Sequence, residues 1–68
     1  MERINRIKEV LASLGKKQSW LADQIGYDEH TVSTWCRNVK QPKLEVLFKI
    51  AEVLDIEARE LLVLRKQS

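Results

Sequence analysis

Apolar residues recur at steps of three and four along most of the chain, which is the spacing of one face of an α-helix. In the first segment these residues are Ile4, Ile7, Leu11 and Leu14. They predict a helix over residues 2–14, and Gly15 predicts its end because glycine readily adopts the left-handed conformation that terminates helices. No segment alternates apolar and polar residues with a period of two, so we expect no strands.

Two short helices are predicted in the middle of the chain. The first covers residues 18–25 and turns Leu21, Ala22 and Ile25 inward; Gly26 then permits a sharp turn. Asp28 is suited to cap the next helix, because its carboxylate can accept an amide proton from the first turn. That helix turns Val32 and Trp35 inward and ends near Asn38, a residue type that tolerates the left-handed conformation.

The last third of the chain predicts a fourth helix after Pro42 and a final helical turn or two. The inward residues expected in the fourth helix are Leu44, Leu47, Phe48, Ile50, Ala51 and Leu54. Asp55 is expected to end this helix, and Leu61, Leu62 and Leu64 belong to the last segment. The pattern therefore predicts an all-α fold, a compact five-helix single domain over residues 1–68.

The segment 18–37 has the features of a helix-turn-helix. Two short helices meet at a turn of three or four residues that contains glycine. Ala22 is expected where the helices cross, because a larger side chain would push them apart. The polar residues expected on the outer face of the later helix are Glu29, His30, Ser33, Thr34 and Arg37. A narrow helix with such a face fits the major groove of DNA, which is about 12 Å wide.

The combined spacing resembles the phage-repressor-like, or Xre-type, helix-turn-helix regulators, whose fold is that of the lambda repressor domain. The residues that carry the resemblance are Gln18, Leu21-Ala22, Ile25-Gly26, Thr31-Val32-Ser33, Trp35, Pro42, Leu44-Glu45-Val46-Leu47, Ile50-Ala51, Leu54-Asp55-Ile56 and Glu60-Leu61-Leu62. The resemblance implies that the third helix is the recognition helix, that Gln18 meets the DNA backbone, and that the protein binds double-stranded DNA as a dimer.

Charge and helix ends suggest further contacts. Amides at a helix start attract phosphate, and basic residues flank two such starts. With Gln18, the predicted phosphate contacts are Lys17, Arg37, Lys40 and Lys43. The predicted base contacts are Glu29, His30, Ser33 and Thr34. The first 43 residues carry eight Lys or Arg against five Asp or Glu, which suits a surface facing a polyanion.

Composition excludes several other classes. The chain is 44% hydrophobic and 32% charged, with a net charge of +2, which is typical of a globular protein and too apolar for disorder. We expect no signal peptide, no membrane segment, no metal, no cofactor and no small-molecule ligand. Cys36 is the one cysteine, which indicates a reducing, cytoplasmic setting. The resemblance implies a bacterial or phage-encoded protein that is associated with the nucleoid. Cys36 and His30 fall on different helix faces, so we do not predict an enzyme.

The sequence thus predicts a sequence-specific transcriptional regulator, a repressor, that places its third helix in the major groove. The predicted homodimer interface consists of Ile56, Leu61, Leu62 and Leu64. The alternative is a protein-interaction or antitoxin-like subunit with the same fold, because Asp28 and Glu29 put negative charge at the front of the third helix. Many members of the resembled family carry an Arg–Glu pair where this chain has Leu11 and Cys36, so we expect these two to touch in the core.

Overall fold

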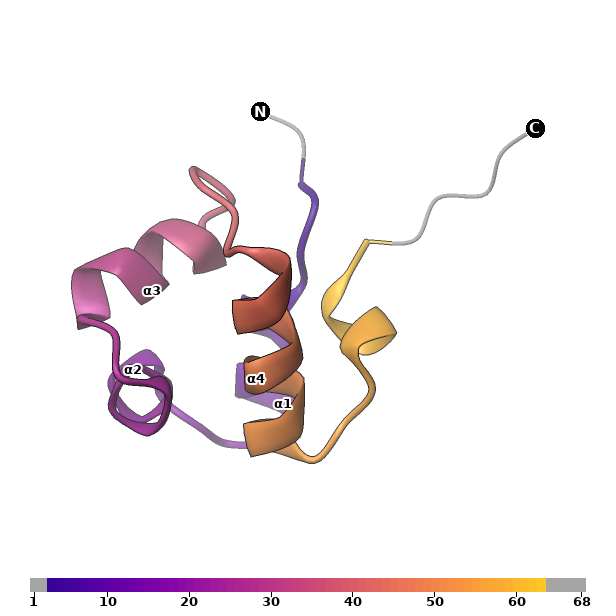
Figure 1. Ribbon diagram of the computed structural model, residues 1–68, viewed down its shortest axis with the longest axis horizontal. Coiled ribbons are helices and arrows are strands. Elements are labelled where there is room, and N and C mark those ends of the chain that lie inside the picture. Colours follow the sequence, from indigo (N-terminus) through magenta and orange to yellow (C-terminus); the bar gives the residue numbers. More distant parts are fainter. Residues whose placement is uncertain (1–2, 64–68) are drawn as a thin grey trace.

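The computed structural model describes residues 3–63 (Figure 1). Within this range it contains four α-helices and one short 3-10 helix: α1 (Ile7–Ser13), α2 (Gln18–Ile25), α3 (Glu29–Cys36), α4 (Leu44–Leu54) and η1 (Ala58–Leu61). The all-α prediction is confirmed, although the last of the five predicted helices is a 3-10 turn. Strand-like pairing within residues 3–63 is limited to one isolated antiparallel bridge, between Asn5 and Leu62.

The helices are arranged so that α2 and α3 form one side of the molecule. α2 packs against α3 and α4, α1 packs against α3 and η1, and α4 packs against η1. In Figure 1, α3 lies at the outer edge, whereas η1 lies on the opposite side of α4. This arrangement leaves one flank of α3 uncovered by the rest of the described chain.

Each α-helix ends at a residue in the left-handed conformation. These residues are Gly15 (φ 68°), Gly26 (φ 76°), Asn38 (φ 59°) and Asp55 (φ 57°). The residue that follows each of them donates its amide proton to a carbonyl five positions earlier: Lys16 to Leu11, Tyr27 to Ala22, Val39 to Thr34 and Ile56 to Ala51, at 2.9 to 3.0 Å. These bonds satisfy carbonyls that a helix end leaves free, and they confirm the predicted helix ends.

A single hydrophobic core is shared by all five elements. Its buried members are Ile7, Leu11, Leu21, Ala22, Ile25, Val32, Trp35, Cys36, Val46, Leu47, Ile50, Ala51, Leu54 and Leu61. Trp20 is half-buried and packs against this cluster, and the Lys16 ammonium lies 4.7 Å from the centre of its ring. Trp20 therefore covers the core and makes a cation–π contact with Lys16.

The start of α1 differs from the prediction. Helical spacing placed Ile4 and Leu14 inward, but Ile4 is 51% exposed and Leu14 is 44% exposed. Ile4 precedes the helix because residues 4–6 are hydrogen-bonded to residues 61–63, with Arg6 N–H donating to the Leu61 carbonyl (2.7 Å) and Val63 N–H donating to the Ile4 carbonyl (2.8 Å). Leu14 lies beyond the last residue of α1, at the turn around Gly15.

The inward face of α4 is also rotated from the predicted one. Leu44 and Phe48 were expected in the core, but they are 67% and 56% exposed. Val46, which the sequence reasoning omitted, is buried instead. At 100° per residue, Leu44 and Phe48 lie on nearly the same side of α4, each about 160° from Val46, so the buried face around Leu47, Ile50 and Leu54 extends to Val46 and not to Leu44 and Phe48.

Candidate nucleic-acid interface

The crossing of α2 and α3 has the predicted construction. Ala22 is 4% exposed at the packed face of α2, and Gly26 makes the turn with its positive φ. The turn is also held from outside, because the Tyr27 ring meets Trp35 edge-on with a centroid distance of 5.2 Å. Tyr27 itself stays 40% exposed. The two short helices are therefore locked together by core contacts on one side and an aromatic pair near the turn.

Most of the predicted outer face of α3 is confirmed. Glu29, His30 and Arg37 are exposed and Ser33 is half-buried. At 100° per residue, these four positions span about one quarter of the helix circumference. They form a polar strip, which we call the α3 face, along the side of α3 that points away from the core.

Thr34 does not belong to this strip. It was predicted to lie on the outer face and to contact bases, but it is 8% exposed and its hydroxyl donates a 2.6 Å hydrogen bond to the Thr31 carbonyl. Its position lies about 40° beyond His30 around the helix, toward the packed side. Local back-bonding of this kind is a common way for a threonine to satisfy its hydroxyl within a helix.

The start of α3 carries a charge arrangement that the sequence suggested only in part. Asp28 occupies the N-cap position, as predicted, but its carboxylate accepts a hydrogen bond from the Thr31 hydroxyl and none from a backbone amide. This hydroxyl lowers the pKa of Asp28 below its ordinary value. The front of α3 therefore presents a carboxylate that stays ionised, next to Glu29.

The predicted phosphate contacts lie at the two expected helix starts and at the end of α3. Lys17 immediately precedes α2 and Lys43 immediately precedes α4, both exposed. Arg37 follows α3, and Lys40 lies in the loop between α3 and α4; both are exposed. Gln18, the first residue of α2, is half-buried. The structure thus places three of these cations next to helix ends, Lys17, Arg37 and Lys43, and the fourth, Lys40, in the loop that follows α3.

A residue that sequence reasoning missed also belongs to this region. Lys8 of α1 and Lys16 and Lys17 before α2 line one open hollow of about 380 Å³, whose other lining residues include Gln18 and Glu29. Lys8 therefore adds positive charge beside the start of α2. The signal in the sequence was its helical spacing, since Lys8 lies one turn before the Leu11–Ala12 pair that also lines the hollow.

Cys36 is a buried thiol and has no features of a reactive one. It is 4% exposed, and burial raises its pKa to about 11 even though the Lys8 ammonium acts in the opposite direction. Leu11 is buried in the same cluster, on the helix that packs against α3. Both residues of the expected Leu11–Cys36 contact are thus in the core. Within residues 3–63, no group of three His, Cys, Asp or Glu could hold a metal ion.

The predicted dimer residues have unequal exposure. Leu61 is 0% exposed, because it lies in the core beneath α1 and α4, so its predicted place in an interface is wrong for this fold. Ile56 and Leu62 are half-buried, and Leu64 lies outside the described residues. Among residues 3–63, no helix is long and apolar enough to cross a membrane.

Comparison with known proteins identifies the class to which this fold belongs. The helix-turn-helix family HTH_3 matches residues 7–61, which include every helix described above, and the chain belongs to this Xre-like family.

A solved structure agrees with that assignment. The chain is similar to one described as "a putative DNA-binding protein from Bacteroides fragilis", with 47% identity and a TM-score of 0.87 over 88% of this chain and 97% of the other. Among curated proteins, none matches this chain.

Proposed function

We propose that the protein is a cytoplasmic regulator that binds double-stranded DNA, acts as a transcriptional repressor and inserts α3 into the major groove. One observation carries the proposal: Glu29, His30 and Arg37 are exposed along one side of α3, and exposed lysines stand at the starts of α2 and α4 and in the loop after α3. Membership in the helix-turn-helix family supports it.

The α3 face supplies the residues that read bases. His30 can both donate and accept a hydrogen bond, Ser33 lies near the middle of the strip, and Glu29 can accept from the amino group of cytosine. Thr34 takes no part, because its hydroxyl is already bonded inside the helix. The absence of an arginine at the front of α3 favours modest affinity for each half-site.

Backbone contacts come from Lys17, Arg37, Lys40 and Lys43, with Gln18 at the start of α2. If all four cations neutralise a phosphate, log K should fall with log salt with a slope of about −3.6 for each bound chain. A large share of the affinity is therefore electrostatic, which compensates for the negative charge of Asp28 and Glu29.

We also propose that two copies bind together and place their recognition helices about 34 Å apart on a near-palindromic site. With Leu61 assigned to the core, Leu62 and Ile56 remain from the predicted interface. Leu62 lines a shallow groove with Ile4 and Leu44, both of which are exposed. This groove extends the apolar surface available to a second copy.

The alternative function, a protein-interaction or antitoxin-like subunit, is favoured by one observation. Asp28 and Glu29 place two carboxylates at the front of α3, where DNA would approach. A partner protein with a basic surface would accept this arrangement more easily than a phosphate backbone would. Affinity for mixed-sequence duplex that falls steeply with salt supports the DNA-binding function, whereas binding that is absent even at low salt supports the alternative.

Selection of bound sites from random duplex DNA tests the proposed function directly. Lys40→Ala/Lys43→Ala should weaken all selected sites alike, whereas Ser33→Ala should change which sites are selected. The control is Lys49→Ala/Arg59→Ala, which removes two exposed cations from α4 and η1 and should leave both affinity and preference nearly unchanged. Failure of the parent protein to enrich any sequence would contradict the proposal.

A further inference from the structure

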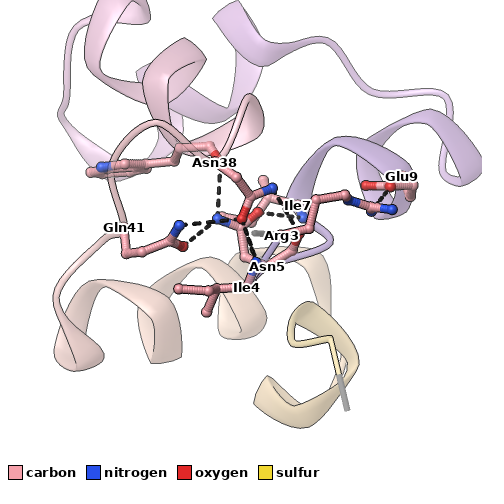
Figure 2. Close-up of polar contacts among 8 residues, drawn as sticks. Arg3, Ile4, Asn5, Ile7, Glu9, Asn38 and Gln41 are labelled. Carbon is pink, nitrogen blue, oxygen red and sulfur yellow. Dashed lines mark hydrogen bonds and ion pairs between the residues drawn. The ribbon is translucent and has the colours of Figure 1, made fainter. Parts of the chain in front are cut away.

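The loop between α3 and α4 carries Lys40 and Lys43. It is hydrogen-bonded to the segment that precedes α1. A network of side-chain amides joins Asn38 and Gln41 of this loop to Asn5, more than thirty residues earlier (Figure 2). Asn5 is 2% exposed and Asn38 is 7% exposed. Every buried side-chain nitrogen and oxygen of the described residues has a hydrogen-bond partner, these amides included.

Asn5 joins three parts of the fold through one side chain. Its Nδ2 donates to the Trp35 carbonyl in the last turn of α3 (2.9 Å) and to Gln41 Oε1 in the loop (2.7 Å). Its Oδ1 accepts the Ile7 amide proton at the start of α1 (3.0 Å). The end of α3 and the loop are thereby held at a fixed distance from α1.

Asn38 completes the network from the other side. Its Oδ1 accepts the amide protons of Ile4 (2.8 Å) and Asn5 (2.9 Å) and a bond from Gln41 Nε2 (3.2 Å). Its Nδ2 donates to the Asn5 carbonyl (3.1 Å). Residues 4–6 bond on their opposite edge to residues 61–63, so the loop is anchored to a segment that is itself fixed.

Helix termination alone does not explain these side chains. Two other helices end at glycine, which adopts positive φ without steric cost, and α4 ends at Asp55, which is exposed. Only at Asn38, among these four ends, is the side chain buried and bonded to a distant segment. The same network holds the loop that follows α3 and carries Lys40 and Lys43.

We propose that Asn5 and Asn38 are positioning residues for DNA binding: they hold the loop 37–43 so that Arg37, Lys40 and Lys43 meet the phosphate backbone in register with α3. The inference rests on the proposed function and adds to it which residues set the backbone contacts. A loop fixed in advance loses less conformational entropy on binding than a mobile one, so the network should raise affinity without touching DNA.

The test uses Asn38→Gly, which keeps the left-handed backbone available and removes all four side-chain bonds. Asp55→Asn and Asp55→Gly provide the matched control, because the difference between them measures an Asn-to-Gly exchange at an equivalent helix end away from the loop. Affinity for a selected duplex is measured by fluorescence anisotropy under conditions where circular dichroism shows every variant folded. We expect Asn38→Gly to weaken binding about tenfold, because a mobile loop must lose the conformational entropy of a few basic side chains when it binds DNA. The control exchange should change the affinity less than about twofold.

A double-mutant cycle separates positioning from a purely structural role. Lys40→Ala/Lys43→Ala lowers the logarithm of the DNA affinity by a certain amount in the parent. In the Asn38→Gly background the same change should lower it by less than half of that amount, because lysines on a loop that is no longer held already contribute less. Losses that add in full would overturn the inference while leaving the proposed function intact. A parent protein that binds no duplex would instead overturn the proposed function.

A measurement without DNA covers the case in which Asn38→Gly is too unstable. Gln41→Ala changes an exposed member of the network and removes its bonds to Asn5 and Asn38. Hydrogen exchange of the Val39 and Lys40 amides, both bonded to the Thr34 carbonyl, should accelerate in this variant. Unchanged exchange would show that the network does not hold the loop and would overturn the inference.

Discussion

Asn38 and Asp55 end different helices with almost the same backbone conformation, φ 59° and 57°, yet only the side chain of Asn38 is buried. Replacement by glycine removes the steric cost of positive φ at both positions. At Asn38 it also removes four hydrogen bonds, whereas at Asp55 it removes an exposed carboxylate from the negative end of the α4 dipole. The two exchanges should therefore have effects of opposite sign.

We expect Asp55→Gly to raise the free energy of unfolding by about 0.5 kcal/mol and Asn38→Gly to lower it by about 2 kcal/mol. Urea unfolding followed by tryptophan fluorescence measures both. Asn38→Asp is the control, because it retains an acceptor for the Ile4 and Asn5 amides but cannot donate to the Asn5 carbonyl; its loss should be intermediate. An Asn38→Gly variant as stable as the parent would contradict the importance of the network.

Thr34 and Ser33 are neighbours on α3 with different environments, and their variants should separate stability from recognition. Thr34→Val removes the bond to the Thr31 carbonyl and should lower the free energy of unfolding by about 1 kcal/mol without changing the preferred DNA sites. Ser33→Ala should change the preferred DNA sites and leave the free energy of unfolding nearly unchanged. Site selection and urea unfolding of both variants check this pair. A changed site preference in Thr34→Val would show that its hydroxyl reaches DNA after all.

The Thr31 hydroxyl should control the ionisation of Asp28. Its hydrogen bond lowers the pKa of this exposed carboxyl, so Thr31→Val should raise the pKa of Asp28 toward its ordinary value, whereas Thr31→Ser should leave it low. A lowered pKa stabilises the folded state above the pKa of the unfolded chain, and this contribution is lost as the pH falls through the folded pKa. Titration of the Asp28 carboxyl by NMR measures the shift, and equal values in the parent and Thr31→Val would exclude the assigned cause.

Leu11 and Cys36 should behave as an apolar replacement of an ion pair. Cys36→Glu alone places a carboxylate in the core and should lower the free energy of unfolding by about 3 kcal/mol. The double variant Leu11→Arg/Cys36→Glu should recover part of that loss, since the new charges can pair. Urea unfolding of the two single variants and the double variant gives the coupling energy. If Cys36→Glu is no less stable than the parent, the contact between positions 11 and 36 does not exist.

Helix ends were predictable because each depends on one local residue. Gly15, Gly26, Asn38 and Asp55 all have types that adopt positive φ, and all four do so. The limits of the inward face of α4 were less predictable, because its apolar residues occupy a wider arc than the core covers and periodicity alone cannot select which margin of that arc is buried. Leu44 and Phe48 were assigned to the core for that reason, but they lie at the margin that stays exposed.

The candidate site shows the same division between local and distant causes. The exposed positions Glu29, His30 and Arg37 follow from helical geometry and could be read from the chain. Thr34 lies just beyond the margin of the same strip, and whether it is buried depends on how closely α3 packs against the neighbouring helices, which the sequence does not give. Asn5 gave no signal at all, because Trp35 and Gln41, to which its amide donates, lie thirty or more positions away and the spacing of Ile4 and Ile7 suggested a helix instead.

The anchoring of residues 4–6 has a consequence for the order in which the protein is completed. These residues are synthesised before their partners, and they bond to Asn38 on one edge and to Leu61 and Val63 on the other. Contacts between such remote positions form late, since closing long loops costs entropy before any bond rewards it. A nascent chain can therefore assemble α2 and α3 early. Residues 4–6, which hold the loop 37–43, gain both sets of partners only after residue 63 has left the ribosome.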